Sequence, residues 1–146
     1  MNVGHELARG LRAAYWAMHR RTNAVLSAHG VTADQFVLLS RLADDDGITQ
    51  QELARRASSD ANTIRPMLLL LQKRGLIIRE AHAHDGRAHS VKLTPKGRWR
   101  FAAMMKDTEH VRRKVLAGVK QGSPKGLLKN LNQIAQIFEK LAANKS

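Results

Sequence analysis

The 146-residue chain has no cysteine, and this absence excludes several kinds of chemistry at once. Without a thiol there is no disulfide, no thiolate zinc site and no cysteine-based redox sensor or nucleophile. Long apolar runs are missing too: the longest is the six residues 13–18, whereas a membrane-spanning helix needs about 20. The N-terminus lacks the apolar segment of a signal peptide. We therefore expect a protein that acts in the cytoplasm and does not enter a membrane.

Acidic residues are scarce relative to basic ones, with 12 Asp and Glu against 25 Lys and Arg and a formal net charge of +13. The excess is uneven: residues 61–100 hold nine basic and two acidic side chains, whereas residues 31–60 hold three basic and six acidic ones. A basic surface of this size predicts a polyanionic partner, usually nucleic acid or an anionic membrane. Solubility alone is the plainer explanation of the same charge.

Features of an enzyme are also missing. The sequence has no glycine-rich phosphate loop and no helical metal motif, and its carboxylates at 44–46 lie in a predicted exposed turn rather than in a convergent pair. We therefore expect no catalytic activity, no cofactor and no bound metal.

Helical periodicity and capping residues predict four helices in the first half of the chain, with approximate ranges 4–28, 33–43, 50–57 and 61–74. Capping boxes open the second and third, where Thr32 pairs with Gln35 and Thr49 with Glu52. Gly75 ends the fourth, because glycine tolerates left-handed dihedrals. The side chains expected inside are Phe36, Leu39, either Leu42 or Ala43, Leu53, Ala54, Ala57, Ile64, Leu68 and Leu71.

After the fourth helix the pattern changes from a period of 3.6 to a period of 2. Residues 76–80 and 90–93 predict the two strands of a short hairpin. Helices resume after a threonine–proline pair at 94–95, running to about Gly118, and after a serine–proline pair at 123–124. Three helices followed by a hairpin are typical of a winged helix-turn-helix.

We therefore expect a mainly α fold with a small β-hairpin. A winged helix-turn-helix domain would occupy residues 31–97, and the flanking helices of residues 1–30 and 98–146 would serve dimerisation.

The fourth helix has the side chains that a DNA-reading helix needs. Asn62, Thr63 and Arg65 lie on its outer face, opposite Ile64 and Leu68. In the major groove, Asn pairs with adenine and Arg with guanine. An ordinary solvated surface would also have polar residues there, so this feature alone leaves both interpretations open.

The predicted hairpin tip favours the DNA-binding interpretation. Gly86 permits a sharp turn, and Arg87 after it is suited to the minor groove, where negative potential is concentrated. Asp85 is placed to hold that arginine by an ion pair. A generic charged turn is the alternative.

The segment from Val31 to Gly97 resembles the DNA-binding domain of the MarR family of bacterial transcriptional regulators. Three pieces carry the resemblance: Gln72-Lys73-Arg74-Gly75-Leu76, the Asp85-x-Arg87 wing and Leu93-Thr94-Pro95-Lys96-Gly97. The resemblance implies a repressor that binds a pseudo-palindromic operator in double-stranded DNA as a homodimer. The residues expected to contact DNA are Thr49, Gln50, Asn62, Thr63, Arg65, Lys73, Arg74 and Arg87.

The chain departs from the family pattern at the fourth helix and at the wing. Pro66 stands where a polar residue is usual, and a helical proline removes one backbone hydrogen bond. Leu69 and Leu70 are apolar where family members are often charged. Ala88 replaces a second wing arginine that many members have.

The resemblance also implies that two protomers interleave their first and last helices. An apolar stripe on the last helix, in alternating steps of four and three, fits such an interface, and packing within one chain is the alternative. The residues expected at the dimer interface are Leu7, Leu11, Leu131, Ile134, Phe138 and Leu141.

Two clusters give weaker signals. His82 and His84 share a strand face, but without a closed ligand set they predict contacts to phosphate or water rather than zinc. Tyr15, Trp16 and His19 gather on the first helix, in a chain with six aromatic residues. Because MarR-family members often bind aromatic acids or phenols, these three are candidates for a pocket whose ligand releases DNA. For these three residues, packing in the dimer core is the alternative. For the protein as a whole, the alternative function is that of an architectural or general DNA-binding protein without ligand response.

Overall fold

The computed structural model describes residues 2–45, 47–82 and 85–144, with the side chains of 82 and 85–88 outside the description. Contacts divide the chain into two units, residues 1–109 and 110–146. The elements in chain order are α1 (Val3–Leu26), the 3₁₀ helix η1 (Ser27–His29), α2 (Ala33–Asp44), β1 (Ile48–Thr49), α3 (Gln50–Arg56), α4 (Ala61–Lys73), β2 (Ile77–His82), β3 (Asp85–Leu93), α5 (Pro95–Asp107), α6 (Glu109–Gly118) and α7 (Pro124–Ala143). The predicted fold class, mainly α with a winged helix-turn-helix, is confirmed.

The sheet has three antiparallel strands in the order β1-β3-β2. Residues 77–82 of β2 pair with β3, beginning with Ile77 opposite Leu93, and Ile48 of β1 pairs with Val91. The predicted hairpin is therefore confirmed as β2 and β3, although its strands were predicted too short at the turn end and the third strand, β1, was not predicted. β1 is only two residues long, so it leaves no periodicity in the sequence.

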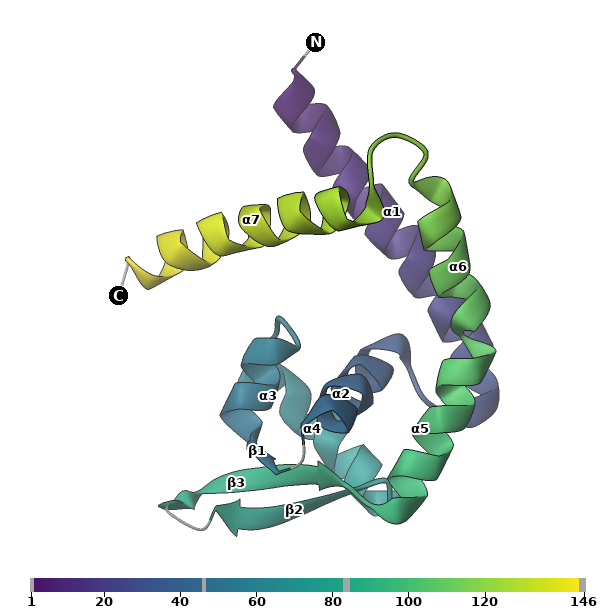
Figure 1. Cartoon of the computed structure of the whole chain (residues 1–146). Helices are drawn as coiled ribbons and strands as arrows, with labels where there is room; N and C mark the ends of the chain where they lie inside the picture. The colour runs from purple at the N-terminus through teal and green to yellow at the C-terminus, as the bar shows by residue number, and fades with distance from the viewer. Residues whose placement is uncertain (1, 46, 83–84, 145–146) are drawn as a thin grey trace. The chain divides into compact units, whose positions relative to one another are not determined.

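The core of the first unit lies where α2, α3 and α4 meet the sheet, on one side of it (Figure 1). Three side chains of α4, Ile64, Leu68 and Leu71, are completely buried in this core. The other predicted inward residues are buried too, with Leu42 rather than Ala43 fully inside, except Phe36 and Ala57, which are half-buried. The Phe36 ring lies 5.5 Å from the Phe101 ring between centroids. The period-3.6 pattern thus identified the inner faces of the helices correctly.

α1 contributes little to this core. Its single buried residue is Leu26, near its C-terminal end, whereas Leu7, Leu11 and Met18 are exposed. Gly30, with φ of 67°, ends the short helix η1 in the left-handed region that glycine tolerates. No described helix has the length and apolar character needed to span a bilayer.

A single helix from 94–95 to Gly118 was predicted, and this was wrong. The structure has two helices, because α5 ends at Asp107 and α6 starts at Glu109. Thr108 lies between them, almost completely buried, and its hydroxyl donates a hydrogen bond of 2.7 Å to the carbonyl of Met104. A buried threonine that bonds back to the preceding turn provides an alternative to continued helical bonding.

α7, in the second unit, has an apolar stripe with no buried member. The exposed fraction along it ranges from 36% at Leu131 to 67% at Phe138. Ser123 caps the helix by accepting a hydrogen bond of 3.0 Å from the Gly126 amide, and Pro124 takes the first helical position as predicted.

The start of α5 lies so close to the backbone of Leu76, the residue before β2, that Gly97 has no room for a side chain. A Cβ added there would lie 2.0 Å from the carbonyl oxygen of Leu76. We predict that Gly97→Ala lowers the free energy of unfolding by about 1–3 kcal/mol, because the backbone must shift to admit the methyl group. Urea unfolding followed by circular dichroism measures this change.

Gly10→Ala is the matched control, because a Cβ at Gly10 of α1 meets nothing within 4 Å. We expect it to raise stability by about 0.5–1 kcal/mol, as alanine does in an open helix position. An unchanged unfolding midpoint in Gly97→Ala would contradict the close approach.

Candidate nucleic-acid interface

The helix-turn-helix consists of α3 and α4, joined by residues 57–60. Ser58 in this turn has φ of 55°, a left-handed conformation rare outside glycine. Asp60 then caps α4 by accepting two hydrogen bonds of 2.8 Å, from the hydroxyl and the backbone amide of Thr63. These bonds lower the pKa of the Asp60 carboxyl. The hydroxyl of Thr63, a predicted DNA contact, is therefore occupied by the cap.

The core fixes which face of α4 points to solvent. Since Ile64, Leu68 and Leu71 are fully buried, the opposite face of the helix is the exposed one. Asn62 and Arg65 lie on that exposed face, and neither side chain forms a hydrogen bond or ion pair with any described residue. The two side chains predicted to read bases are thus brought together and available to a ligand.

Thr49 and Gln50, at the start of α3, have internal partners. The Thr49 hydroxyl accepts a hydrogen bond of 3.1 Å from the Glu52 amide. The Gln50 side-chain oxygen accepts one of 3.1 Å from Arg79 of β2. Both residues are half-buried, and their contact with DNA stays a prediction.

α3 also carries a cluster of ion pairs. Glu52 accepts hydrogen bonds from Arg55, at 2.6 and 2.9 Å, and from Arg56, at 2.9 Å, and Arg56 also bonds Asp45. The two arginines lower the pKa of Glu52 from 4.5 to about 2. Because the folded pKa lies below the ordinary one, the stabilisation is present above pH 4.5 and is lost as the pH falls towards 2.

Arg74 directly follows α4, and its side chain links the C-terminal end of this helix to η1. Its guanidinium donates hydrogen bonds of 2.6 Å to the carbonyl of Gly30 and 2.8 Å to that of His29. His29 in turn lies 2.7 Å from the Asp107 carboxylate at the end of α5. This structural role was not predicted, since its partners are carbonyl groups 44 and 45 residues away. The predicted DNA contact of Arg74 stays a prediction, whereas Lys73 beside it is exposed.

Part of the predicted wing lies outside the described residues. This holds for the side chains of Asp85 and Arg87, for the side chain of His82 and for His84 entirely. The described part of the wing is the paired backbone of β2 and β3. Within the described residues, no group of three His, Asp or Glu side chains is placed to hold a metal ion.

The aromatic cluster predicted on α1 is present. The Trp16 ring lies 5.4 Å from that of Tyr15 and 5.0 Å from that of His19, between centroids. His19 is engaged elsewhere, at 3.2 Å from the Asp34 carboxylate and 3.2 Å from the Asn23 amide nitrogen.

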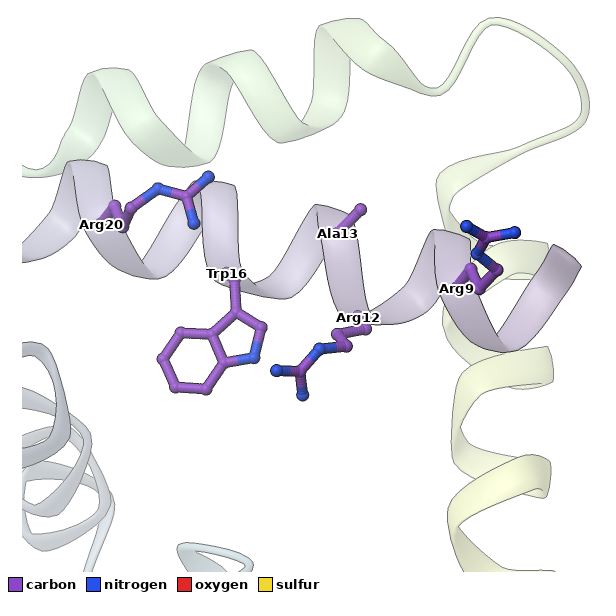
Figure 2. Close-up of a pocket in the computed structure, with 5 residues that line it drawn as sticks. All are labelled: Arg9, Arg12, Ala13, Trp16 and Arg20. Carbon is purple, nitrogen blue, oxygen red and sulfur yellow. The ribbon is translucent and has the colours of Figure 1, made fainter. Parts of the chain in front are cut away.

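Trp16 lines an open hollow of about 490 Å³ on α1 (Figure 2). The other residues of the hollow are Arg9, Arg12, Ala13 and Arg20. Arg12 points to the same side of the helix as Trp16, with its guanidinium carbon 5.9 Å from the ring centroid. Cations beside an indole ring suit an anionic aromatic molecule.

Two comparisons with known proteins decide the family. A model of the MarR family matches residues 31–89. A candidate transcriptional regulatory protein for the hcr operon of Thauera aromatica is 30% identical over 134 residues, which cover 88% of this chain and 78% of that protein. The chain belongs to the MarR family. A shorter match, 36% identical over 76 residues, links it to an HTH-type transcriptional repressor of Mycobacterium tuberculosis; the match covers 52% of this chain and 55% of that protein.

Solved structures of bacterial transcriptional regulators share this fold. A mutant of Escherichia coli MarR in complex with operator DNA superimposes with a TM-score of 0.78 at 24% identity, covering 88% of this chain and 93% of that one. The M. tuberculosis regulator MosR in complex with DNA also gives 0.78 at 24% identity, covering 92% and 96%. At this identity the likeness shows the fold alone.

The neighbours Lys73 and Arg74 allow a matched test of structural and surface roles. We predict that Arg74→Ala lowers the free energy of unfolding by about 1–2 kcal/mol, because the carbonyl groups of His29 and Gly30 lose a charged donor. Arg74→Lys should restore little, since lysine cannot bridge both carbonyl groups. Lys73→Ala should change stability by less than about 0.5 kcal/mol. Equal stability of the two alanine variants in urea unfolding would contradict the structural role of Arg74.

Proposed function

We propose that this chain is a sequence-specific regulator of transcription that binds double-stranded DNA as a homodimer and represses the genes beside its operator. The observation that carries the proposal is the exposed, unengaged pair Asn62 and Arg65, held outward by the buried face of α4. A helix of this kind fits a major groove roughly 12 Å wide.

The exposed face of α4 suits contacts to bases near its N-terminus and contacts to the DNA backbone near its C-terminus. The Arg65 guanidinium can donate two hydrogen bonds to guanine, and the Asn62 amide can pair with adenine. Lys73, near the end of the same helix, supplies a positive charge for phosphate, which adds affinity without sequence preference. Repression is inferred from the M. tuberculosis relative that is named a repressor.

The apolar stripes of the terminal helices support the dimer. Leu7 and Leu11 of α1 are exposed in the single chain. The apolar side chains of α7 are exposed too, namely Leu127, Leu128, Leu131, Ile134, Ile137, Phe138 and Leu141. An exposed apolar surface of this extent favours an intermolecular interface. Two-fold symmetry would then place the second α4 on the other half of a pseudo-palindrome.

Release of DNA by a small anionic aromatic ligand is the third part of the proposal. The hollow beside Trp16 offers an indole face and the guanidinium groups of Arg9, Arg12 and Arg20. A ligand held there would weaken DNA binding if it favours a dimer whose α4 spacing does not match the groove spacing.

Exchanging single side chains of α4 tests the DNA-reading role. We predict that Arg65→Ala lowers affinity for a selected site much more than for random duplex, because a base contact is lost. Lys73→Ala should weaken both duplexes by a similar factor and reduce the salt dependence of binding. Competition binding against random DNA measures both effects, with a preference of about 10³–10⁷ expected for the unmodified protein. Equal binding of selected and random duplex would instead favour a general DNA-binding protein.

Charge placed on the α7 stripe tests the dimer. We predict that the unmodified protein sediments as a dimer at micromolar concentration, and that Leu131→Asp shifts it to monomer because a carboxylate cannot be buried unpaired. Gln136→Asp introduces the same charge on the opposite face of α7 and should leave the dimer intact. A monomeric unmodified protein would refute the interface.

Titration with benzoates and phenols tests ligand release. We predict that at least one of these compounds lowers affinity for the selected DNA site, and that Arg12→Ala weakens the response. The variant should bind DNA normally without the compound. If a broad panel leaves DNA affinity unchanged, the ligand-release part of the proposal fails while the DNA-binding part stands.

A further inference from the structure

The middle of the exposed face of α4 is apolar, which the base-reading role of its first turn does not explain. Leu69 is 47% exposed and Leu70 is 53% exposed, and Pro66 beside them is also exposed. The buried face of the helix is already complete without them, since Ile64 and Leu68 fill the core.

Helix geometry puts these apolar groups on the DNA-reading line. With 3.6 residues per turn, Asn62, Pro66, Leu69 and Lys73 occupy successive turns along one side of α4. Leu69 therefore lies about 10 Å along the helix from Asn62, which corresponds to about three base pairs of rise. Leu70 lies at the margin of this line. When Asn62 contacts a base in the groove and Lys73 contacts phosphate, the apolar segment between them lies over the base edges of the groove.

The major groove offers one apolar group to such a segment. Base edges there present hydrogen-bond donors and acceptors, and thymine adds its 5-methyl group. A leucine pressed on a guanine or cytosine edge would leave polar atoms without partners, which is costly once water is excluded. A leucine on a thymine methyl loses nothing and removes apolar surface from water.

We infer that Leu69, with the ring of Pro66 beside it, contacts the 5-methyl group of a thymine in each half-site, about three base pairs from the pair read by Asn62. The inference rests on the proposed function, because it needs α4 in the major groove. It makes Leu69 a specificity-determining residue that selects thymine by shape rather than by hydrogen bonds.

Replacing thymine by uracil tests this contact, because the exchange removes the methyl group and keeps base pairing. A preferred site is first selected from a library of random duplexes with the full chain, and each thymine is then replaced in turn. At one thymine per half-site, we expect uracil to weaken binding by about fourfold, as the loss of one buried methyl-sized group predicts. For Leu69→Ala, the same thymine and uracil duplexes should bind within about 1.5-fold of each other.

Val37→Ala is the control, since Val37 is 39% exposed on α2 and away from the reading line. This variant should keep the fourfold preference for thymine. If the chain selects a site but uracil has no effect at any position, or has the same effect on Leu69→Ala, Leu69 contacts something other than DNA and the inference fails while the proposed function stands. If no site is selected at all, both fail.

Discussion

The burial of one face of α4 is the constraint on which the rest of the molecule depends. Ile64, Leu68 and Leu71 have no exposed surface, and they lock the helix against α2, α3 and the sheet. Because a helix cannot turn about its axis without exposing that face, its opposite side is fixed outward. A rotation of one residue, about 100°, would bring polar side chains into the core at a cost of several kcal/mol.

Hydrogen bonds hold both ends of α4 as well. Asp60 holds the first turn through Thr63, and Arg74 holds the last turn to the carbonyl groups of His29 and Gly30. The Thr94 hydroxyl donates a further hydrogen bond, of 2.6 Å, to the carbonyl of Gly75 just beyond the helix. In the proposed function, a helix fixed at its face and at both ends would bind DNA without a further loss of conformational entropy, and preorganisation of this kind favours affinity.

Local features of the fold were predictable from the sequence, and features formed by distant residues were not. The capping box at Thr32, the cap at Thr49 and the glycine after α4 act within one helical turn, so their residue types alone reveal them. At Thr49 only the hydroxyl half of the predicted box forms, because the Glu52 carboxylate bonds Arg55 and Arg56. Strand β1 is defined by its pairing with β3 more than 40 residues later, and two residues carry no period. The break at Thr108 depends on burial of a hydroxyl group that an amphipathic pattern does not display.

In the candidate site, too, the sequence predicted the features set by one helix and missed those that depend on distant residues. Asn62 and Arg65 could be placed on the outer face because the apolar period of α4 is strong. The sequence could not predict that the Thr63 hydroxyl bonds Asp60, or which groups Gln50 and Arg74 bond. Each of these contacts depends on the position of another side chain or carbonyl group in space. Leu69 and Leu70 were visible as departures from the family pattern, but their meaning required knowing that they are exposed.

The most direct test of α4 as the reading element is chemical interference mapping of the protein on its selected DNA site, which reports for each groove where the protein contacts DNA. If α4 of each protomer lies in the major groove, methylation of guanine N7 there interferes in two patches about 10 base pairs apart on one face of the duplex. Interference confined to the minor groove, or spread evenly along the duplex, would contradict an outward-facing α4 as the reading element.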